Sequence, residues 1–302
     1  MPDKWLSNYS VLSIILILVS MTATGVLPTE DKLTYTETIQ KKAHFENYNY
    51  TGNLLSISTI YGNVSVEKHS GDAVEITAEK QIRAHQKEDL NRGIKEMKLV
   101  VEEEGDQILI YLDAPFVHHN KSDRGVHYTI EISREEIGYE FVYDITVIVP
   151  QNVDIYATSI IGDVSILQID NSELIAKSVN GNIHLLNVSG KTTATTVNGN
   201  VTATHRKSPS GDSEYKTVNG TIEVFFPENL SADIHFSSLH GHLYTDFKDV
   251  ERITATVESN ISQNNGTRFR INHSSPFRIG DGGTELRFNV LNGNVYIKKL
   301  KI

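Results

Sequence analysis

The chain has 302 residues, no cysteine and a formal net charge of −10 at neutral pH. The lack of cysteine excludes disulfides, thiolate metal sites and a cysteine nucleophile. The acidic balance argues against a nucleic-acid or anionic-lipid partner, since such partners depend on clustered Lys and Arg. A short basic tail, Lys298, Lys299 and Lys301, is interpreted as a solvated strand end rather than a binding site.

The first 25 residues have the order of a secretory signal peptide. Lys4 precedes an apolar run from Val11 to Val19, and Ala23, Thr24 and Gly25 follow. We expect cleavage after Gly25. An uncleaved anchor is the alternative, although the run is shorter than the roughly 20 residues that span a membrane.

Residues 26–50 are expected to form a linker or a first strand, and residues 51–150 a β-rich part with one helix. Leu90, Ile94 and Met97 recur at helical spacing amid charged residues, which predicts an amphipathic helix over about residues 86–98. Strands are predicted over residues 107–112 and 143–150. The intervening residues 115–127 include His118 and His119 and are expected to form a polar loop.

Residues 151–302 are dominated by a repeated phrase. Val179-Asn180-Gly181-Asn182-Ile183 recurs in similar form around Gly162, Gly199 and Gly220, more weakly around Gly241, and again around Gly62 and Gly293. Between residues 162 and 241 the period is 18 to 21 residues, which is typical of stacked β-repeats. The Asn-Gly pairs are predicted to be corners, because Gly and Asn tolerate a positive φ.

Alternation after each glycine predicts which side chains face the core. Apolar residues occupy one parity, as in Ile183 and Leu185, so the other parity should point outward. The outward set is Ser165, His184, Thr202 and Glu223. Before the glycines, the recurring Ala157, Ala176 and Ala194 predict a narrow interior.

The predicted fold class is all-β. A right-handed, single-stranded parallel β-helix is favoured, because near-identical phrases stacked in parallel form like-on-like ladders. An antiparallel β-sandwich is the alternative, since Asn-Gly between alternating strands also signals a hairpin. Between residues 250 and 283 the period is interrupted, so the number of coils there is left open.

Residues 50–302, and residues 145–224 most clearly, resemble a bacterial family of β-strand-repeat proteins known as putative adhesins, a domain of unknown function. The resemblance rests on Pro150-Gln151-Asn152-Val153 followed by the Asn-Gly-Asn units. It implies a right-handed single-stranded β-helix, an exported location and no known catalytic residues.

The residues themselves support no catalytic, cofactor-binding or metal-site assignment. Asp163 and Glu223 should lie three coils apart, roughly 14 Å at about 4.8 Å per coil, which is too far for a carboxylate pair. His235, His240 and His242 are interpreted as surface imidazoles, with metal binding left open because no further ligand is set by spacing.

The sequence therefore favours a non-catalytic β-solenoid, exported to the periplasm, cell surface or exterior, that serves as an adhesin or binding scaffold without a cofactor. Its expected partner is a cell-surface or envelope component, either glycan or protein. An envelope-stress or regulatory accessory protein and a carbohydrate-active β-helix enzyme are the alternatives.

Overall fold

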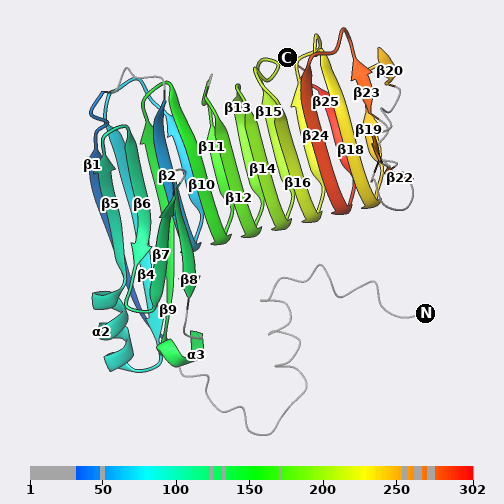
Figure 1. Cartoon of the computed structure of the whole chain (residues 1–302). Helices are drawn as coiled ribbons and strands as arrows, with labels where there is room; N and C mark the ends of the chain where they lie inside the picture. The colour runs from blue at the N-terminus through cyan, green and yellow to red at the C-terminus, as the bar shows by residue number, and fades with distance from the viewer. Residues whose placement is uncertain are drawn as a thin grey trace, which may run out of the picture. The chain divides into compact units, whose positions relative to one another are not determined.

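The computed structural model describes residues 32–47, 52–122, 125–130, 134–170, 172–253, 258–261, 267–270 and 276–301. The signal peptide predicted over residues 1–25 lies outside these ranges. From Leu33 onward the chain forms one compact unit built on two long sheets (Figure 1). Each repeat contributes one strand to each sheet, on either side of its corner glycine.

The strands lie side by side in two sheets, in order from one edge of each sheet to the other. Sheet A contains β1 (Leu33–Ala43), β4 (Val74–Ala84), β9 (Tyr139–Val149), β3 (Val64–Lys68), β11 (Val164–Leu167), β13 (Ile183–Val188), β15 (Val201–His205), β17 (Ile222–Phe226), β25 (Val295–Lys299) and β19 (Leu243–Thr245). Sheet B contains β20 (Val250–Arg252), β23 (Phe277–Ile279), β18 (Ala232–His240), β24 (Thr284–Asn292), β16 (Ser213–Asn219), β14 (Thr192–Asn198), β12 (Leu174–Asn180), β10 (Val153–Ile161), β2 (Asn53–Tyr61), β6 (Gln107–Asp113) and β5 (Lys98–Glu104).

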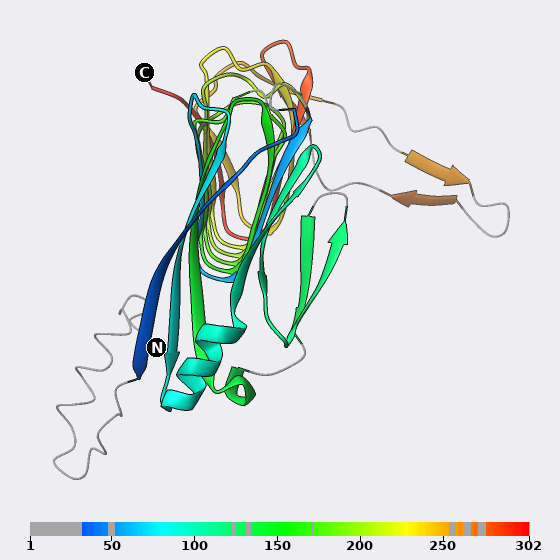
Figure 2. The ribbon, with the colours of Figure 1, turned by 90° about the vertical axis from the view of Figure 1, so that its left-hand side faces the viewer.

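The repeat strands pair in parallel and in register, as the stacked-repeat prediction requires. Ala157 lies opposite Ala176, which lies opposite Ala194 in the next coil. Seen along the stack, the coils superpose as nested loops (Figure 2). The antiparallel sandwich is therefore wrong for the repeats, while the right-handed winding remains a prediction.

Antiparallel strands close one end of the stack. β9 pairs in parallel with β3 but antiparallel with β4, and β4 pairs antiparallel with β1. In sheet B, β6 follows β2 in parallel and β5 pairs antiparallel with β6. The predicted strands over residues 107–112 and 143–150 are confirmed as β6 and β9.

The predicted helix is confirmed as α2 (Lys87–Glu96), which contacts β1, β4 and β9. Its carboxyl end is fixed by Lys80, whose ammonium group donates hydrogen bonds to the carbonyls of Ile94 and Met97 at 2.8 and 2.9 Å. These acceptors have no partner within the helix, so the buried lysine satisfies them. Gly93 is needed for packing, because a Cβ there would lie 2.7 Å from the Tyr139 ring.

The predicted loop over residues 115–127 is wrong. β7 (Val117–Ser122) and β8 (Gly125–Ile130) pair antiparallel, followed by the short helix α3 (Arg134–Ile137). Tyr128 anchors this hairpin, since its hydroxyl donates to the Ser58 carbonyl and accepts the Leu112 N–H. These contacts are distant in sequence, which is why local polarity was misleading.

The last repeat is inserted into the stack rather than added to its end. β24 lies between β16 and β18, and β25 lies between β17 and β19, so residues 284–299 separate two coils that are consecutive in the chain. Beyond β18, β23 and β20 pair antiparallel. A separate hairpin comprises β21 (Glu258–Ile261) and β22 (Thr267–Arg270).

Backbone contact between corner glycines sets the spacing of the coils. A Cβ on Gly199 would lie 2.1 Å from the carbonyl oxygen of Gly181, and one on Gly220 would lie 1.9 Å from that of Gly199. Any side chain would have to displace backbone at such a distance. Glycine is therefore required sterically, and the corner prediction is confirmed with a more specific cause than positive φ.

The corner asparagines have a role other than the predicted one. None of them has a positive φ; the described non-glycine residues that do are Asn152, Gln168 and Asn187. Instead, their amides form a ladder in which Nδ2 of Asn198 donates to Oδ1 of Asn180 and Nδ2 of Asn219 donates to Oδ1 of Asn198, both at 2.8 Å. Asparagine is favoured at these positions because each side-chain amide can bond to the same amide in the next coil.

A second ladder follows each glycine. Oδ1 of Asn182 accepts the backbone N–H of Asn200 at 2.9 Å, and Oδ1 of Asn200 accepts that of Thr221 at 2.8 Å. Inside the corner, the Thr196 hydroxyl donates to the Gly181 carbonyl at 2.8 Å. Each corner thus satisfies polar groups that stacking would otherwise leave without partners.

The interior changes character along the stack. The predicted alanines fill its middle, whereas the equivalent position in later coils holds Tyr215 and Phe288, whose rings stack with centroids 5.1 Å apart. The Tyr215 hydroxyl lies 2.6 Å from Nε2 of the buried His205, which stacks on Phe226. Burial lowers the pKa of the His205 imidazole to about 3.

We expect Gly199→Val to destabilise the chain by more than about 1 kcal/mol, because the new side chain would collide with the Gly181 carbonyl. Thr202→Lys should change stability by no more than about 0.5 kcal/mol, since Thr202 points outward. Urea denaturation of both variants measures the difference. Equal effects would contradict the assignment of inward and outward positions.

His205 should make the fold sensitive to acid. Its folded pKa of about 3 lies below the ordinary 6.5, so between these values the unfolded chain binds more protons and stability falls as pH falls. The slope should approach about 1.4 kcal/mol per pH unit below pH 6. In urea denaturation between pH 7 and 5, His205→Gln should flatten this slope, whereas His184→Gln, an exposed control, should not.

Candidate binding surface

The sequence-predicted outward positions form one column on sheet A. Ser165 lies opposite His184, which lies opposite Thr202, and Glu223 follows in the next coil. All four side chains are exposed or half-buried. The same column continues through Tyr296 to Tyr244, because the inserted coil takes the next place.

Asp163 and Glu223 belong to coils that are three strands apart in sheet A, as predicted. Asp163 is also engaged in the corner ladder, since its Oδ1 accepts the N–H of Asn182 at 2.7 Å. The structure therefore does not bring these two carboxylates together as an acid and base pair.

The three histidines near residue 240 do not converge. His235 lies in β18 with its Nε2 3.9 Å from Oε1 of Glu285, while His240 lies opposite Asn292 and the backbone of His242 donates to Asn294. His240 lies five positions after His235 in the same strand, or roughly 16 Å away. Within the described ranges, no three His, Asp or Glu side chains are grouped as metal ligands.

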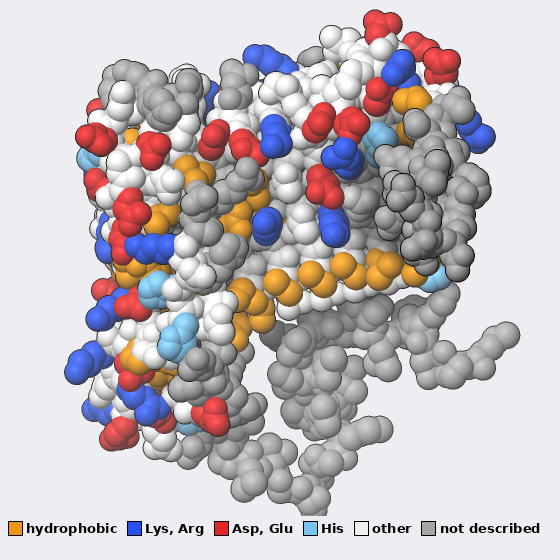
Figure 3. Space-filling model, viewed as in Figure 1, with side chains coloured by type: hydrophobic (Ala, Val, Ile, Leu, Met, Phe, Trp, Pro, Cys, Tyr) orange, Lys and Arg blue, Asp and Glu red, His pale blue; other side chains and the backbone are white. Residues whose placement is uncertain are grey.

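An apolar ridge, which was not predicted, runs along sheet B beside the corners. One aliphatic residue per coil occupies the position two before the corner glycine, as a row along the lower edge in Figure 3. Its members are Ile160, Val179, Val197, Val218, Leu291 and Leu239. Val197 is 37% exposed and Leu239 is 66% exposed, and Val197 directly follows the buried Thr196.

The signal for this ridge was present in the sequence. Val precedes Asn-Gly in three of the repeats, at Val179, Val197 and Val218. Their parity relative to the buried Ala176 and Ala194 places them outward, but a β-branched residue in a strand is ordinarily attributed to the core. The structure shows that Val179 and Val197 are exposed, as their parity indicates.

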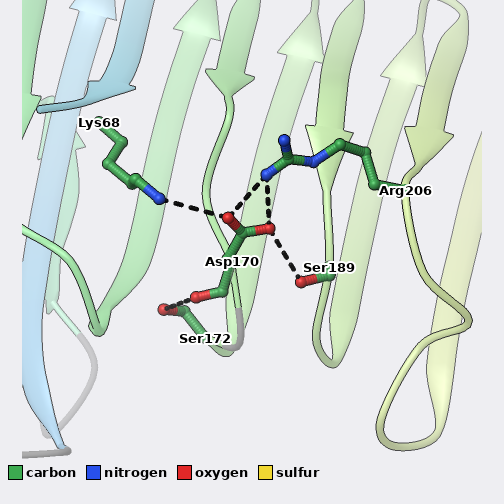
Figure 4. A network of polar contacts seen from close by, with 5 residues as sticks. All are labelled: Lys68, Asp170, Ser172, Ser189 and Arg206. Carbon is green, nitrogen blue, oxygen red and sulfur yellow. Dashed lines mark hydrogen bonds and ion pairs between the residues drawn. The ribbon is translucent and has the colours of Figure 1, made fainter.

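A second unpredicted feature is a polar cluster on Asp170, at the turn opposite the glycine corners (Figure 4). Arg206 donates to both carboxylate oxygens of Asp170, at 2.9 and 2.7 Å, and Lys68 approaches one of them at 3.3 Å. Ser189 donates to the same carboxylate at 3.2 Å. The cluster joins residues up to 138 positions apart in the sequence, so no local motif could predict it.

Partial burial of Asp170 opposes its ionisation, but hydrogen bonds from Arg206 and Lys68 outweigh burial and hold the pKa of the carboxyl below its ordinary value. The charge of Asp170 is thus matched by two cations from other coils, Lys68 from the adjacent coil and Arg206 from two coils away. Such an arrangement fixes the turns relative to one another.

No helix in the described part of the chain is long and apolar enough to cross a membrane. The fold and surface together define a stacked β-repeat protein whose outer columns are ordered by coil geometry.

Residues 143–273 match the family model described as Toastrack DUF4097. The match begins within β9 and covers most of the coils, and it confirms over these residues the predicted resemblance to a β-repeat domain of unknown function. No curated protein matches the sequence.

Three solved structures are similar over 87% of this chain. A putative cell adhesion protein from Clostridium sporogenes ATCC 15579 is 10% identical, with 100% of that chain covered and a TM-score of 0.38. A putative adhesin from Bacteroides fragilis NCTC 9343 is 11% identical, with 97% covered and a TM-score of 0.29. A putative lipid binding protein from Parabacteroides distasonis ATCC 8503 is 11% identical, with 97% covered and a TM-score of 0.21.

Asp170→Asn should destabilise the fold by about 1 to 3 kcal/mol, because it removes the charge that pairs with Arg206 and Lys68 while keeping the size of the side chain. Asp249→Asn, at an exposed position, should stay within about 0.5 kcal/mol. Thermal unfolding at low and moderate salt measures both. A harmless Asp170→Asn would show that the cluster does not tie the coils together.

Proposed function

We propose that this chain is an exported, non-catalytic binding scaffold of the bacterial cell envelope, with adhesin-like use of a right-handed β-solenoid. The observation that carries the proposal is the in-register stacking of the coils, which converts each outward repeat position into a long column of similar side chains. Stacked repeats commonly use extended surfaces of this kind for recognition.

The expected partner is a cell-surface or envelope component, either glycan or protein. The apolar ridge supports a contact role, because it is continuous over several coils and directly borders the asparagine ladder. Such a row combines apolar area with hydrogen-bonding amides, as the centre and rim of a binding interface do. Recognition would then be spread over many modest contacts.

The proposal is tested by the binding of the purified full chain to bacterial envelope fractions and cell-surface glycan arrays. Single alanine changes at Ser165, His184, Thr202 and Glu223 should each reduce binding modestly. Turnover of a polysaccharide by the purified chain, abolished by one carboxylate substitution, would overturn the scaffold proposal in favour of an enzyme.

The ridge makes a separate prediction. Val197→Lys combined with Leu291→Lys should weaken binding to the same preparations by at least about tenfold, because two charges would be placed in the apolar contact. Thr195→Lys, on the same face but outside the row, is the control. Melting curves should show all variants folded, and undiminished binding of the double variant would exclude the ridge from the interface.

A further inference from the structure

The outer face of sheet A becomes aromatic near the inserted coil. Tyr296 and Tyr244 stack with ring centroids 5.2 Å apart and planes inclined by 14°, and Tyr244 is 48% exposed. Phe225 lies beside them, two residues after Glu223 on β17, with its side chain half-buried. Earlier coils carry Ser165, His184 and Thr202 in this column, so the aromatic surface is specific to this end.

Lys298 of the basic tail lies on this aromatic surface, so this lysine is not merely part of a solvated strand end. The Lys298 ammonium is 5.5 Å from the Phe225 ring centre and 5.4 Å from that of Tyr296, and it is ion-paired with Glu223. Lys299 similarly lies over the Phe247 ring at 5.3 Å. Contacts of this kind hold lysine side chains in place against rings.

A hollow of about 520 Å³ opens beside these residues. Its apolar lining comes from Phe225 and Leu300, its hydroxyl from Thr204 and its carboxylate from Asp246. The remaining lining residues are Lys298, Lys299 and Lys301. Three lysines and one aspartate thus line the hollow, in a chain whose net charge is −10. Because Lys298 is paired with Glu223, Lys299 and Lys301 are the lysines best placed to receive an anion.

We propose that this hollow binds an acidic sugar residue of an envelope glycan. The Phe225 ring would pack against the C–H face of the sugar, and Lys299 and Lys301 would pair with its carboxylate. The inference rests on the proposed binding function and names the class of ligand at one place on the scaffold. The volume is in the range that small-molecule sites occupy.

Asp246 favours a sugar over an acidic peptide. Its carboxylate accepts the backbone N–H of Lys299 at 2.8 Å and retains oxygen lone pairs that sugar hydroxyls can donate to. The side chains of an acidic peptide would bring carboxylates but no hydroxyl groups to donate to Asp246. Thr204 adds a hydroxyl that can both donate and accept.

The test is calorimetric titration of the full chain with trigalacturonate, with neutral galactotriose and with triglutamate as comparison probes. Trigalacturonate should bind, and its affinity should fall as the salt concentration rises, because the pairing is between exposed charges. The double variant Lys299→Gln, Lys301→Gln should lose at least about tenfold in affinity. Lys216→Gln, an exposed lysine on sheet B, removes one charge elsewhere and should leave the affinity unchanged.

Phe225→Leu keeps apolar volume but removes the ring, and it should also weaken trigalacturonate binding in a variant shown by its melting curve to be folded. Equal binding of galactotriose or of triglutamate, or no effect of the lysine changes, would overturn the proposal. If trigalacturonate fails to bind while the chain still binds envelope fractions, the acidic-sugar site falls and the scaffold function stands. If both fail, the scaffold function falls as well.

Discussion

Backbone contact at the glycine corners is the constraint on which the rest of this structure depends. A Cβ on any of these corner glycines would lie between 1.7 and 2.1 Å from the carbonyl oxygen of the glycine in the neighbouring coil. The corner glycines are Gly162, Gly181, Gly199, Gly220, Gly293 and Gly241. Removing the side chain at this one position lets the chain turn between the sheets without spreading the coils. The amide ladders on either side of the glycine, and the parallel pairing of both sheets, require that spacing.

The same constraint shapes the surface. Since equivalent residues of successive coils must lie one strand apart, any outward repeat position becomes a column, whether polar on sheet A or aliphatic along the ridge. Columns of this kind offer area and periodicity rather than a convergent pocket. That geometry suits distributed recognition, and it explains why the carboxylates Asp163 and Glu223 stay apart.

Irregular positions create the local sites. Insertion of the last coil brings Lys298 onto Phe225 and Glu223, which lie more than 70 residues earlier, and extends the outer column with two stacked tyrosines. The turn at Asp170 likewise gathers cations from Lys68 and Arg206. In both places a regular ladder is interrupted by residues that only the folded chain makes neighbours.

The sequence by itself determined the repeat, its corners, the inward and outward parity and a helix over about residues 86–98, because each depends on a local period that residue type reveals. Tertiary structure alone decided the β7–β8 hairpin, whose anchor at Tyr128 pairs with residues 16 and 70 positions away. It also decided the place of the last coil and the Asp170 cluster. Those features depend on the order of the strands in the sheets. That order is stabilised by contacts between residues far apart in the sequence, which no local pattern connects.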